Sequence, residues 1–488
     1  MSKNFIDSLK ATTLPDKLTE NGADAYSTLN SALLDAFSIA GSLRSRTDGE
    51  IQEIYRKAYD EDPQLALRLL FYTGDIRYLG LGERRTFRIW LRWLAENHPS
   101  VLMNNLWLIP YYNRWDSIFV LLGTECEDEM AELVQAQFLS DLKDPENCSL
   151  LAKWLPSENA HSKETKKLAK IFMGILGFSP RDYRKALSFL RAHCNVVERE
   201  MSSNKWGAVA YDKVPSVAMN RYNPAFARHD YERFSYYLRE VRGNVKKINA
   251  GTLYPYNIVE KMMYKNIDLT ERETLELQWK NLPNYVSGEN NYLVMADVSG
   301  SMSGRPMATS VGLAIYFAQR NKGYYKNSFM TFTDNPTVQT IDPNKTLYEN
   351  IRKVTANVGY STNLEAAFNL IYTTARRKKM KQADLPAALI VISDMEINRY
   401  MAGSGMDFLG TFEAKFKAIG LEMPKIVFWN VASRANTYLS NDPNVINVSG
   451  QSTNAFKSLC GYLEGKTAYD FMVETLMNPA YNLINWED

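Results

Sequence analysis

The spacing of apolar residues divides the chain into two parts. From about residue 25 to 285, apolar positions recur every three or four residues, as in "DPQLALRLLFYTG", "ERRTFRIWLRWLAENH" and "KETKKLAKIFMGILG". This period is typical of amphipathic helices, and Ser162 and Ser179 stand where N-caps are expected. Because helix follows helix without strands between them, the pattern predicts a stack of paired helices, a solenoid or ring.

Beyond about residue 288, short and uniformly apolar runs such as "NYLVMADV", "AALIVISD" and "KIVFWNVA" alternate with helical segments. Strands that are apolar on both faces predict a mostly parallel sheet between two layers of helices. In "NSFMTFTDNPTVQTI" only "DNP" separates two strands, which predicts a hairpin with an antiparallel edge strand. We therefore expect a multidomain protein: a helical domain over residues 1–285 and a doubly wound, Rossmann-like α/β domain over residues 286–488.

Composition excludes some classes of protein. The chain contains no run of about 20 apolar residues, and its first 20 residues lack the apolar core of a secretory signal. We therefore expect a cytoplasmic protein that contacts no membrane. The four cysteines and four histidines show none of the spacings typical of zinc sites.

Three loops that follow or precede predicted elements carry hard oxygen ligands. They contain Asp297, Ser299 and Ser301, then Thr362, and then Ser393, Asp394 and Glu396. In an open α/β sheet, such loops meet beyond the carboxyl ends of the strands. Hydroxyls and carboxylates without His or Cys suit a divalent cation, Mg²⁺ first, with Mn²⁺ or Ca²⁺ as alternatives. The competing interpretation is that D-x-S-x-S only caps a helix.

The same residues resemble the metal-ion-dependent adhesion site (MIDAS) of von Willebrand factor A domains. D-x-S-x-S follows a buried strand, Thr362 precedes a helix, and Asp394 ends a later strand. The resemblance implies that Ser299, Ser301 and Thr362 ligate the ion directly, and that Asp297 and Asp394 act largely through water. It also implies an open coordination position for an acidic group from a partner.

The amino-terminal part adds a second resemblance. The stretches "NGADAYSTLNSALLDAFSIAGSLR", "IPYYNRWDSIFVLLGT" and "HDYERFSYYLREVRGNVKKINAGTLYPYNIV", followed by "VSGSMSGRPM", resemble the TROVE-domain family of the Ro autoantigen. The branch they resemble is that of uncharacterised plant, phage and giant-virus relatives. The family implies a ring of HEAT-like helical repeats closed by an A domain. It also implies a ribonucleoprotein role, with single-stranded ends of misfolded RNAs in the hole and small structured RNAs on the outer surface.

The distribution of charge bears on an RNA partner. Residues 151–270 contain 21 Lys and Arg against 11 Asp and Glu, whereas residues 1–150 contain 15 against 23. The candidate RNA-binding residues in this basic block are Lys163, Lys166, Lys167, Lys170, Arg184, Lys185, Arg233, Lys246 and Lys247. Like charges three and four residues apart destabilise a helix unless an anion compensates, and RNA phosphates are such anions. Pairing with the acidic part, or simple solvation, is the alternative.

The aromatic and apolar residues in "YERFSYYLREVR" divide into two groups. Tyr231, Phe234 and Leu238 have the spacing of core positions, whereas Tyr236 and Tyr237 are candidates for base stacking.

Two functions fit these observations. The first is a non-catalytic RNA-binding protein whose A domain offers a metal site to an acidic or phosphate ligand. The second is a metal-dependent adaptor that binds an acidic protein partner without RNA. An enzyme is not expected, because the predicted loops lack a His, Lys or Cys suited to acid–base or nucleophilic chemistry.

Overall fold

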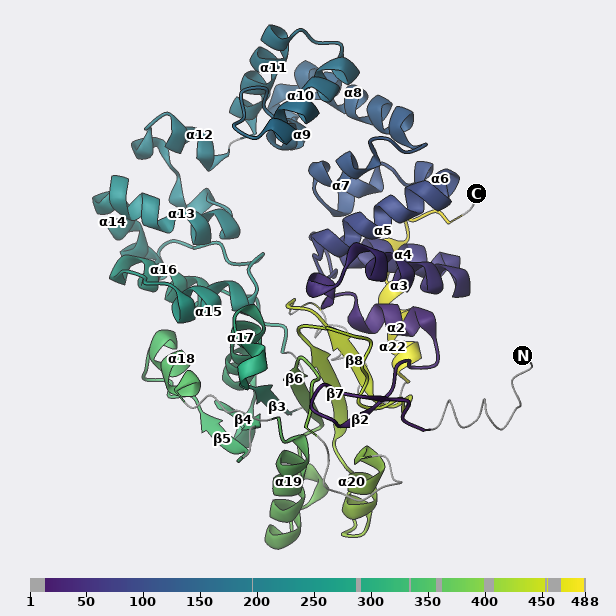
Figure 1. Cartoon of the computed structure of the whole chain (residues 1–488). Coiled ribbons are helices and arrows are strands. Elements are labelled where there is room, and N and C mark those ends of the chain that lie inside the picture. Colours follow the sequence, from purple (N-terminus) through teal and green to yellow (C-terminus); the bar gives the residue numbers. More distant parts are fainter. Residues whose placement is uncertain are drawn as a thin grey trace, which may run out of the picture.

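A computed structural model describes residues 14–194, 196–286, 291–332, 335–356, 362–398, 408–452, 454 and 467–486 of the 488-residue chain. Its helices run up one side of the molecule, across the top and down the other side, and a sheet closes the ring at the bottom (Figure 1). None of the helices in these ranges is long and apolar enough to cross a membrane.

Between residues 14 and 194, which the structure describes, ten α-helices form the first side of the ring and its top. They are α2 (Ala32–Ile39), α3 (Asp48–Glu61), α4 (Pro63–Gly74), α5 (Arg84–Asn97), α6 (Pro99–Met103), α7 (Leu108–Tyr112), α8 (Glu127–Lys143), α9 (Leu151–Trp154), α10 (Lys163–Leu176) and α11 (Pro180–His193). The predicted caps are confirmed, since the side chains of Ser162 and Ser179 accept hydrogen bonds from the backbone N–H groups of Thr165 and Asp182. Gly177 ends α10 at φ +69°, a conformation that glycine adopts without strain.

The second side of the ring descends to the sheet. It comprises α12 (Val197–Ser202), α13 (Ser216–His229), α14 (Tyr231–Arg242), α15 (Pro255–Tyr264) and α16 (Leu269–Lys280). Within the described residues of 14–286, the regular secondary structure is thus helical apart from a pair of two-residue strands, β1 (Lys17–Leu18) and β2 (Asp24–Ala25).

The carboxy-terminal part contains a six-stranded mixed sheet in the order β5-β4-β3-β6-β7-β8. Its strands are β3 (Tyr292–Asp297), β4 (Ser328–Phe332), β5 (Thr337–Thr340), β6 (Ala388–Ser393), β7 (Lys425–Asn430) and β8 (Ile446–Ser449). Neighbouring strands are parallel, except that β5 pairs antiparallel with β4 at the edge. The predicted edge hairpin is therefore confirmed.

Helices cover both faces of this sheet. The accompanying helices are α17 (Arg305–Arg320), α18 (Leu347–Thr355), α19 (Leu364–Lys378), α20 (Phe408–Lys417) and α22 (Ala468–Leu476). Alternate residues along β3 and β6 belong to different cores: Val294 and Ile390 join the one that contains α17 and the first helices of the ring, whereas Met295 and Val391 pack with α19 and α20. This period of two is the one that a sheet buried on both faces requires.

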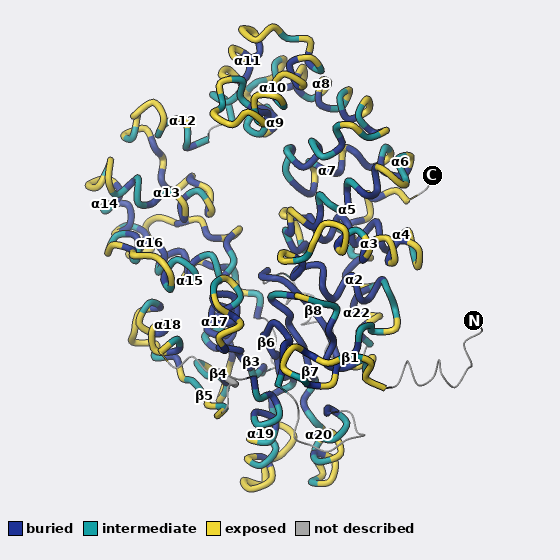
Figure 2. Tube along the Cα trace, in the orientation of Figure 1, coloured by how far each residue is buried: buried dark blue, intermediate teal, exposed yellow. Residues whose placement is uncertain are grey.

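The two ends of the chain bind the ring and the sheet together. Helix α22 packs on α2 and α4, and the hydroxyl of Tyr481 donates a 2.8 Å hydrogen bond to Asp75. A Cβ atom on Gly41 would lie 2.5 Å from the carbonyl oxygen of Ser449, so only glycine fits where α2 ends against β8. Buried positions accordingly continue from α2 into β8 (Figure 2). Residues near both chain ends thus make contacts between the two predicted domains. The domain boundary at residues 285/286 itself stays a prediction.

Candidate functional site

The first predicted site residue, Asp297, is the last residue of β3 and is fully buried. The adjacent parallel strand β6 ends at Ser393, whose hydroxyl donates a 2.6 Å hydrogen bond to Asp297 Oδ2. The backbone N–H of Ser299 donates to Asp297 Oδ1 over 2.9 Å. Burial raises the pKa of Asp297 to about 7, and the negative charge of Asp394 contributes to this rise.

The loop after β6 holds the second carboxylate in a strained turn. Met395 has φ +67°, a left-handed conformation that costs a non-glycine residue about 1 kcal/mol. Its N–H donates to Ser393 Oγ over 3.0 Å, and its side chain is buried in the sheet core. Through this turn Asp394 Oδ1 accepts a 3.2 Å hydrogen bond from the N–H of Glu396. Within the described residues, the buried Asp394 Oδ2 has no hydrogen-bond partner.

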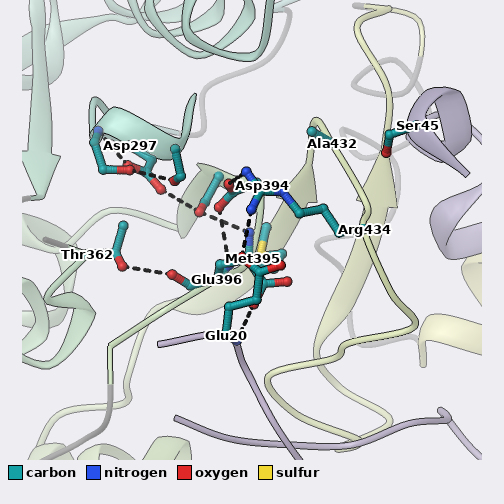
Figure 3. Close-up of polar contacts among 12 residues, drawn as sticks. Glu20, Ser45, Asp297, Thr362, Asp394, Met395, Glu396, Ala432 and Arg434 are labelled. Atoms are coloured by element: carbon teal, nitrogen blue, oxygen red, sulfur yellow. Dashed lines mark hydrogen bonds and ion pairs between the residues drawn. The ribbon is translucent and has the colours of Figure 1, made fainter. Parts of the chain in front are cut away.

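Thr362 lies just before α19 and is tied to the same loop. Its hydroxyl forms hydrogen bonds with the carbonyl oxygen of Glu396, at 2.8 Å, and with Oδ1 of Asn398, at 3.0 Å (Figure 3). The two hydroxyls of D-x-S-x-S, Ser299 and Ser301, are 3.1 Å apart, and Ser301 is exposed. The β3 loop and the β6 loop therefore meet, with Thr362 anchored to the second of them.

This donor set fits a hard divalent cation. Two buried carboxylates are close enough for Asp394 to raise the pKa of Asp297, and one buried oxygen of Asp394 accepts no hydrogen bond. A buried carboxylate is costly without a compensating positive charge. Within the part of the chain that the structure describes, no three His, Cys, Asp or Glu side chains gather as a metal site, and the other oxygen donors at this cluster are hydroxyls.

Sequence reasoning missed two charged residues beside this cluster, Glu20 and Arg434. One oxygen of the Glu20 carboxylate lies 2.6 Å from Nη1 of Arg434, whose Nη2 lies 3.8 Å from Asp394 Oδ2. Arg434 was detectable in principle, because it follows β7, the strand next to β6 in the sheet. Glu20 left no signal in the sequence, since it lies 376 residues before Glu396, the residue its backbone contacts.

The predicted RNA-binding residues differ in whether they have partners within the chain. Several already have partners: Arg184 pairs with Glu158, Arg233 bonds the carbonyl oxygens of Gly207 and Val209, and Lys246 Nζ lies 2.9 Å from Glu240. The remaining six are exposed, and none of them forms an ion pair with another described residue: Lys163, Lys166, Lys167, Lys170, Lys185 and Lys247. Four of these six lie on α10, at the top of the ring (Figure 1).

Among the described residues, no Lys or Arg of 151–270 pairs with a carboxylate of 1–150. On α14, Phe234 and Leu238 are buried as predicted, and the aromatic side chain of Tyr236 is exposed. Two expectations are wrong: Tyr231 is exposed because α14 begins there, and Tyr237 is buried because it packs in the core formed with α13.

Comparisons with known sequences identify domains whose function is not known. Residues 19–117 and 179–289 match a domain of unknown function, DUF2828, and residues 291–475 match a second one, DUF7788. The uncharacterized protein L728 of Acanthamoeba polyphaga mimivirus is 28% identical over 489 aligned positions, covering 90% of this chain and 84% of the viral protein.

A solved structure relates the architecture to a named protein. The Ro (RSR) protein of Deinococcus radiodurans superposes with a TM-score of 0.51 at 14% sequence identity, over 90% of this chain and all of the other. The fold is Ro-like. At this level of identity the likeness concerns the fold alone, so the Ro resemblance drawn from the sequence is confirmed for the architecture. The assignments to HEAT-like repeats and to a von Willebrand A domain stay predictions.

Proposed function

We propose that this protein binds RNA without acting on it catalytically, through α10 of its Ro-like ring. The observation that carries the proposal is the row of Lys163, Lys166, Lys167 and Lys170, exposed on α10 and without ion pairs to other described residues. Their spacing puts like charges next to one another on the helix surface, where phosphates would relieve the repulsion. Both small structured RNAs and single-stranded ends of misfolded RNAs are candidate partners.

The cluster at the ends of β3 and β6 is the second part of the proposal, as a MIDAS-like metal centre. Ser299, Ser301 and Thr362 would hold Mg²⁺ directly, and Asp297 and Asp394 would orient bound water. A bound Mg²⁺ would supply an electrophilic position for an acidic or phosphate group. The negative charges of Asp297 and Asp394 would balance part of the charge of the ion, and the Ser393 hydroxyl, which bonds Asp297, joins the two loops.

The finer fold assignments belong to the same proposal. Successive packing of α2 on α3, of α3 on α4 and of α4 on α5 supports HEAT-like repeats. The position of D-x-S-x-S at the carboxyl end of a central parallel strand supports a von Willebrand A domain. A cytoplasmic location and the absence of catalysis complete the proposal.

The test for RNA is fluorescence anisotropy with a labelled RNA hairpin that carries a single-stranded 3′ tail. Charge reversal in Lys166→Glu/Lys167→Glu/Lys170→Glu is expected to weaken binding about 10- to 100-fold near 0.1 M salt. It should also reduce the slope of log affinity against log salt by about 2, because three phosphate contacts are lost.

The chain offers a matched control at the end of α19. Arg377, Lys378 and Lys381 are also exposed, so reversing them changes the net charge equally on a different surface. An equal loss of RNA affinity in both variants would mean that only the net charge of the protein matters, and would contradict the assignment of the RNA site to α10. If the unaltered protein binds no RNA, and a protein partner is lost on Asp297→Asn, the metal-dependent adaptor replaces the RNA-binding proposal.

A further inference from the structure

The N-terminal segment lies along the loop that carries the β6 half of the proposed metal centre. Thr19 Oγ1 donates a 2.5 Å hydrogen bond to the carbonyl oxygen of Ile397, and Asn21 Nδ2 donates over 2.7 Å to that of Glu396. Gly22 forms an antiparallel bridge with Asn398. Because the Thr362 hydroxyl is held by the same Glu396 and Asn398, this segment supports the backbone that positions a proposed metal ligand.

One residue of this segment also holds a cation beside the cluster. The N–H of Glu20 donates a 2.5 Å hydrogen bond to Glu396 Oε2, and its carboxylate lies 2.6 Å from Nη1 of Arg434. The other end of that guanidinium, Nη2, is 3.8 Å from Asp394 Oδ2. Figure 3 shows Arg434 reaching toward Asp394, with Glu20 below Glu396.

The two contacts of Arg434 differ in strength. Its distance to Glu20 is that of a charge-assisted hydrogen bond, whereas 3.8 Å to Asp394 is an ion-pair distance without a hydrogen bond. Asp394 Oδ2 is buried and accepts no hydrogen bond from any described residue. The guanidinium is therefore near enough to offset the negative charge of Asp394, while Glu20 keeps it short of direct contact.

We propose that Arg434 competes with the divalent cation for Asp394, and that Glu20 of the N-terminal segment limits this competition by holding the guanidinium back. This inference rests on the proposed metal centre. The Arg434 guanidinium lies at ion-pair distance from the buried carboxylate of Asp394. A dication bound at Asp394 would repel this guanidinium, because both are positively charged. Arg434 is thereby a positioning residue that sets how tightly the metal is held.

The direction of each effect follows from the charges. Removing the Arg434 charge removes repulsion against the metal and leaves Asp394 without its counter-charge, so both changes favour metal binding. A charge about 4 Å from a ligand oxygen acts strongly on a bound cation, and screening by solvent around the partly exposed guanidinium reduces the expected effect on metal affinity to about tenfold. Removing the Glu20 charge frees Arg434 to approach Asp394, which should weaken metal binding.

The test is calorimetric titration of the full-length protein with MnCl2, repeated with MgCl2. Arg434→Gln is expected to bind Mn²⁺ about tenfold more tightly than the unaltered protein, and Glu20→Gln about threefold more weakly. The double variant Glu20→Gln/Arg434→Gln should match Arg434→Gln alone, because Glu20 acts only through Arg434. Arg434→Lys keeps the charge and should bind within about twofold of the unaltered protein.

A distant ion pair supplies the control. Arg56 on α3 pairs with Glu53 and Asp60, so Arg56→Gln makes the same charge change away from the cluster and should leave Mn²⁺ affinity unchanged. Unchanged or weaker Mn²⁺ binding by Arg434→Gln, in a protein whose binding is lost on Asp297→Asn, overturns the inference and leaves the metal centre intact. Absence of Mn²⁺ binding in the unaltered protein overturns the metal centre itself, and the inference with it.

Discussion

The carboxyl-end cluster of β3 and β6 and the lysine row of α10 are built in opposite ways. Asp297 is buried and receives a hydrogen bond from Ser393, 96 residues later, whereas the lysines are exposed within residues 163–170 of one helix. A buried carboxylate needs compensation from its surroundings, and an exposed lysine is already solvated by water. The difference teaches that the two proposed sites rest on different kinds of evidence. The metal centre rests on the burial of its carboxylates, and the RNA site rests on neighbouring like charges without ion-pair partners among the described residues.

The largest expected effect separates the two sites. Asp297→Asn keeps the side-chain shape but removes the charge, and should weaken Mn²⁺ binding about 100-fold while RNA affinity stays within about twofold. Calorimetry and anisotropy on the same preparation measure both. Ser303→Ala, an exposed change in the same loop outside D-x-S-x-S, is the control. A parallel fall in RNA affinity would mean that the two sites are one.

An effect of intermediate size concerns the contact between α2 of the ring and the segment that follows β7 of the sheet. Asp35 of α2 is buried beside Tyr438, and burial raises its pKa from 3.8 to about 6. Between pH 4 and 6 the folded state holds a proton that the unfolded state has lost, so the stability of the protein should fall as pH rises and level off above pH 6.

Asp35→Asn removes this titration. Relative to the variant, the unaltered protein should lose about 2 kcal/mol of unfolding free energy between pH 4 and 7, measured by denaturant unfolding at each pH. If the difference in unfolding free energy between the unaltered protein and Asp35→Asn is the same at pH 4 and pH 7, the raised pKa of Asp35 is contradicted.

The smallest expected effect lies on α10. Lys167→Ala should change the unfolding free energy by less than about 0.5 kcal/mol, with a slight stabilisation because a like-charge pair is removed. Denaturant unfolding would detect a larger loss. A loss of unfolding free energy above about 1.5 kcal/mol would mean that Lys167 stabilises the fold, and would contradict its assignment as a solvated residue free to bind RNA.

The secondary structure was more predictable from the sequence than the contacts around the candidate sites. The helical first part, the parallel sheet and the edge hairpin follow from local periodicity, which depends on residues a few positions apart. The proximity of Asp297 and Asp394 was predictable because strand ends of a parallel sheet share one edge. Glu20 was not, because nothing in its neighbourhood indicates a contact 376 residues away. The partners of Arg184, Arg233 and Lys246 were missed because charge counting does not reveal local pairing.

The sequence by itself determined the helix caps, the strands and the residue types of the proposed metal centre, because each depends on local backbone preferences or on position at a strand end. The tertiary structure alone decided that the N-terminal segment and α22 cross between ring and sheet. It also decided that Arg434 stands between Glu20 and Asp394 and that four lysines of α10 have no ion-pair partner among the described residues. The physical reason is that these contacts join residues from about 40 to about 400 positions apart, such as Arg434 with Asp394 and Tyr481 with Asp75, which meet only when the chain folds.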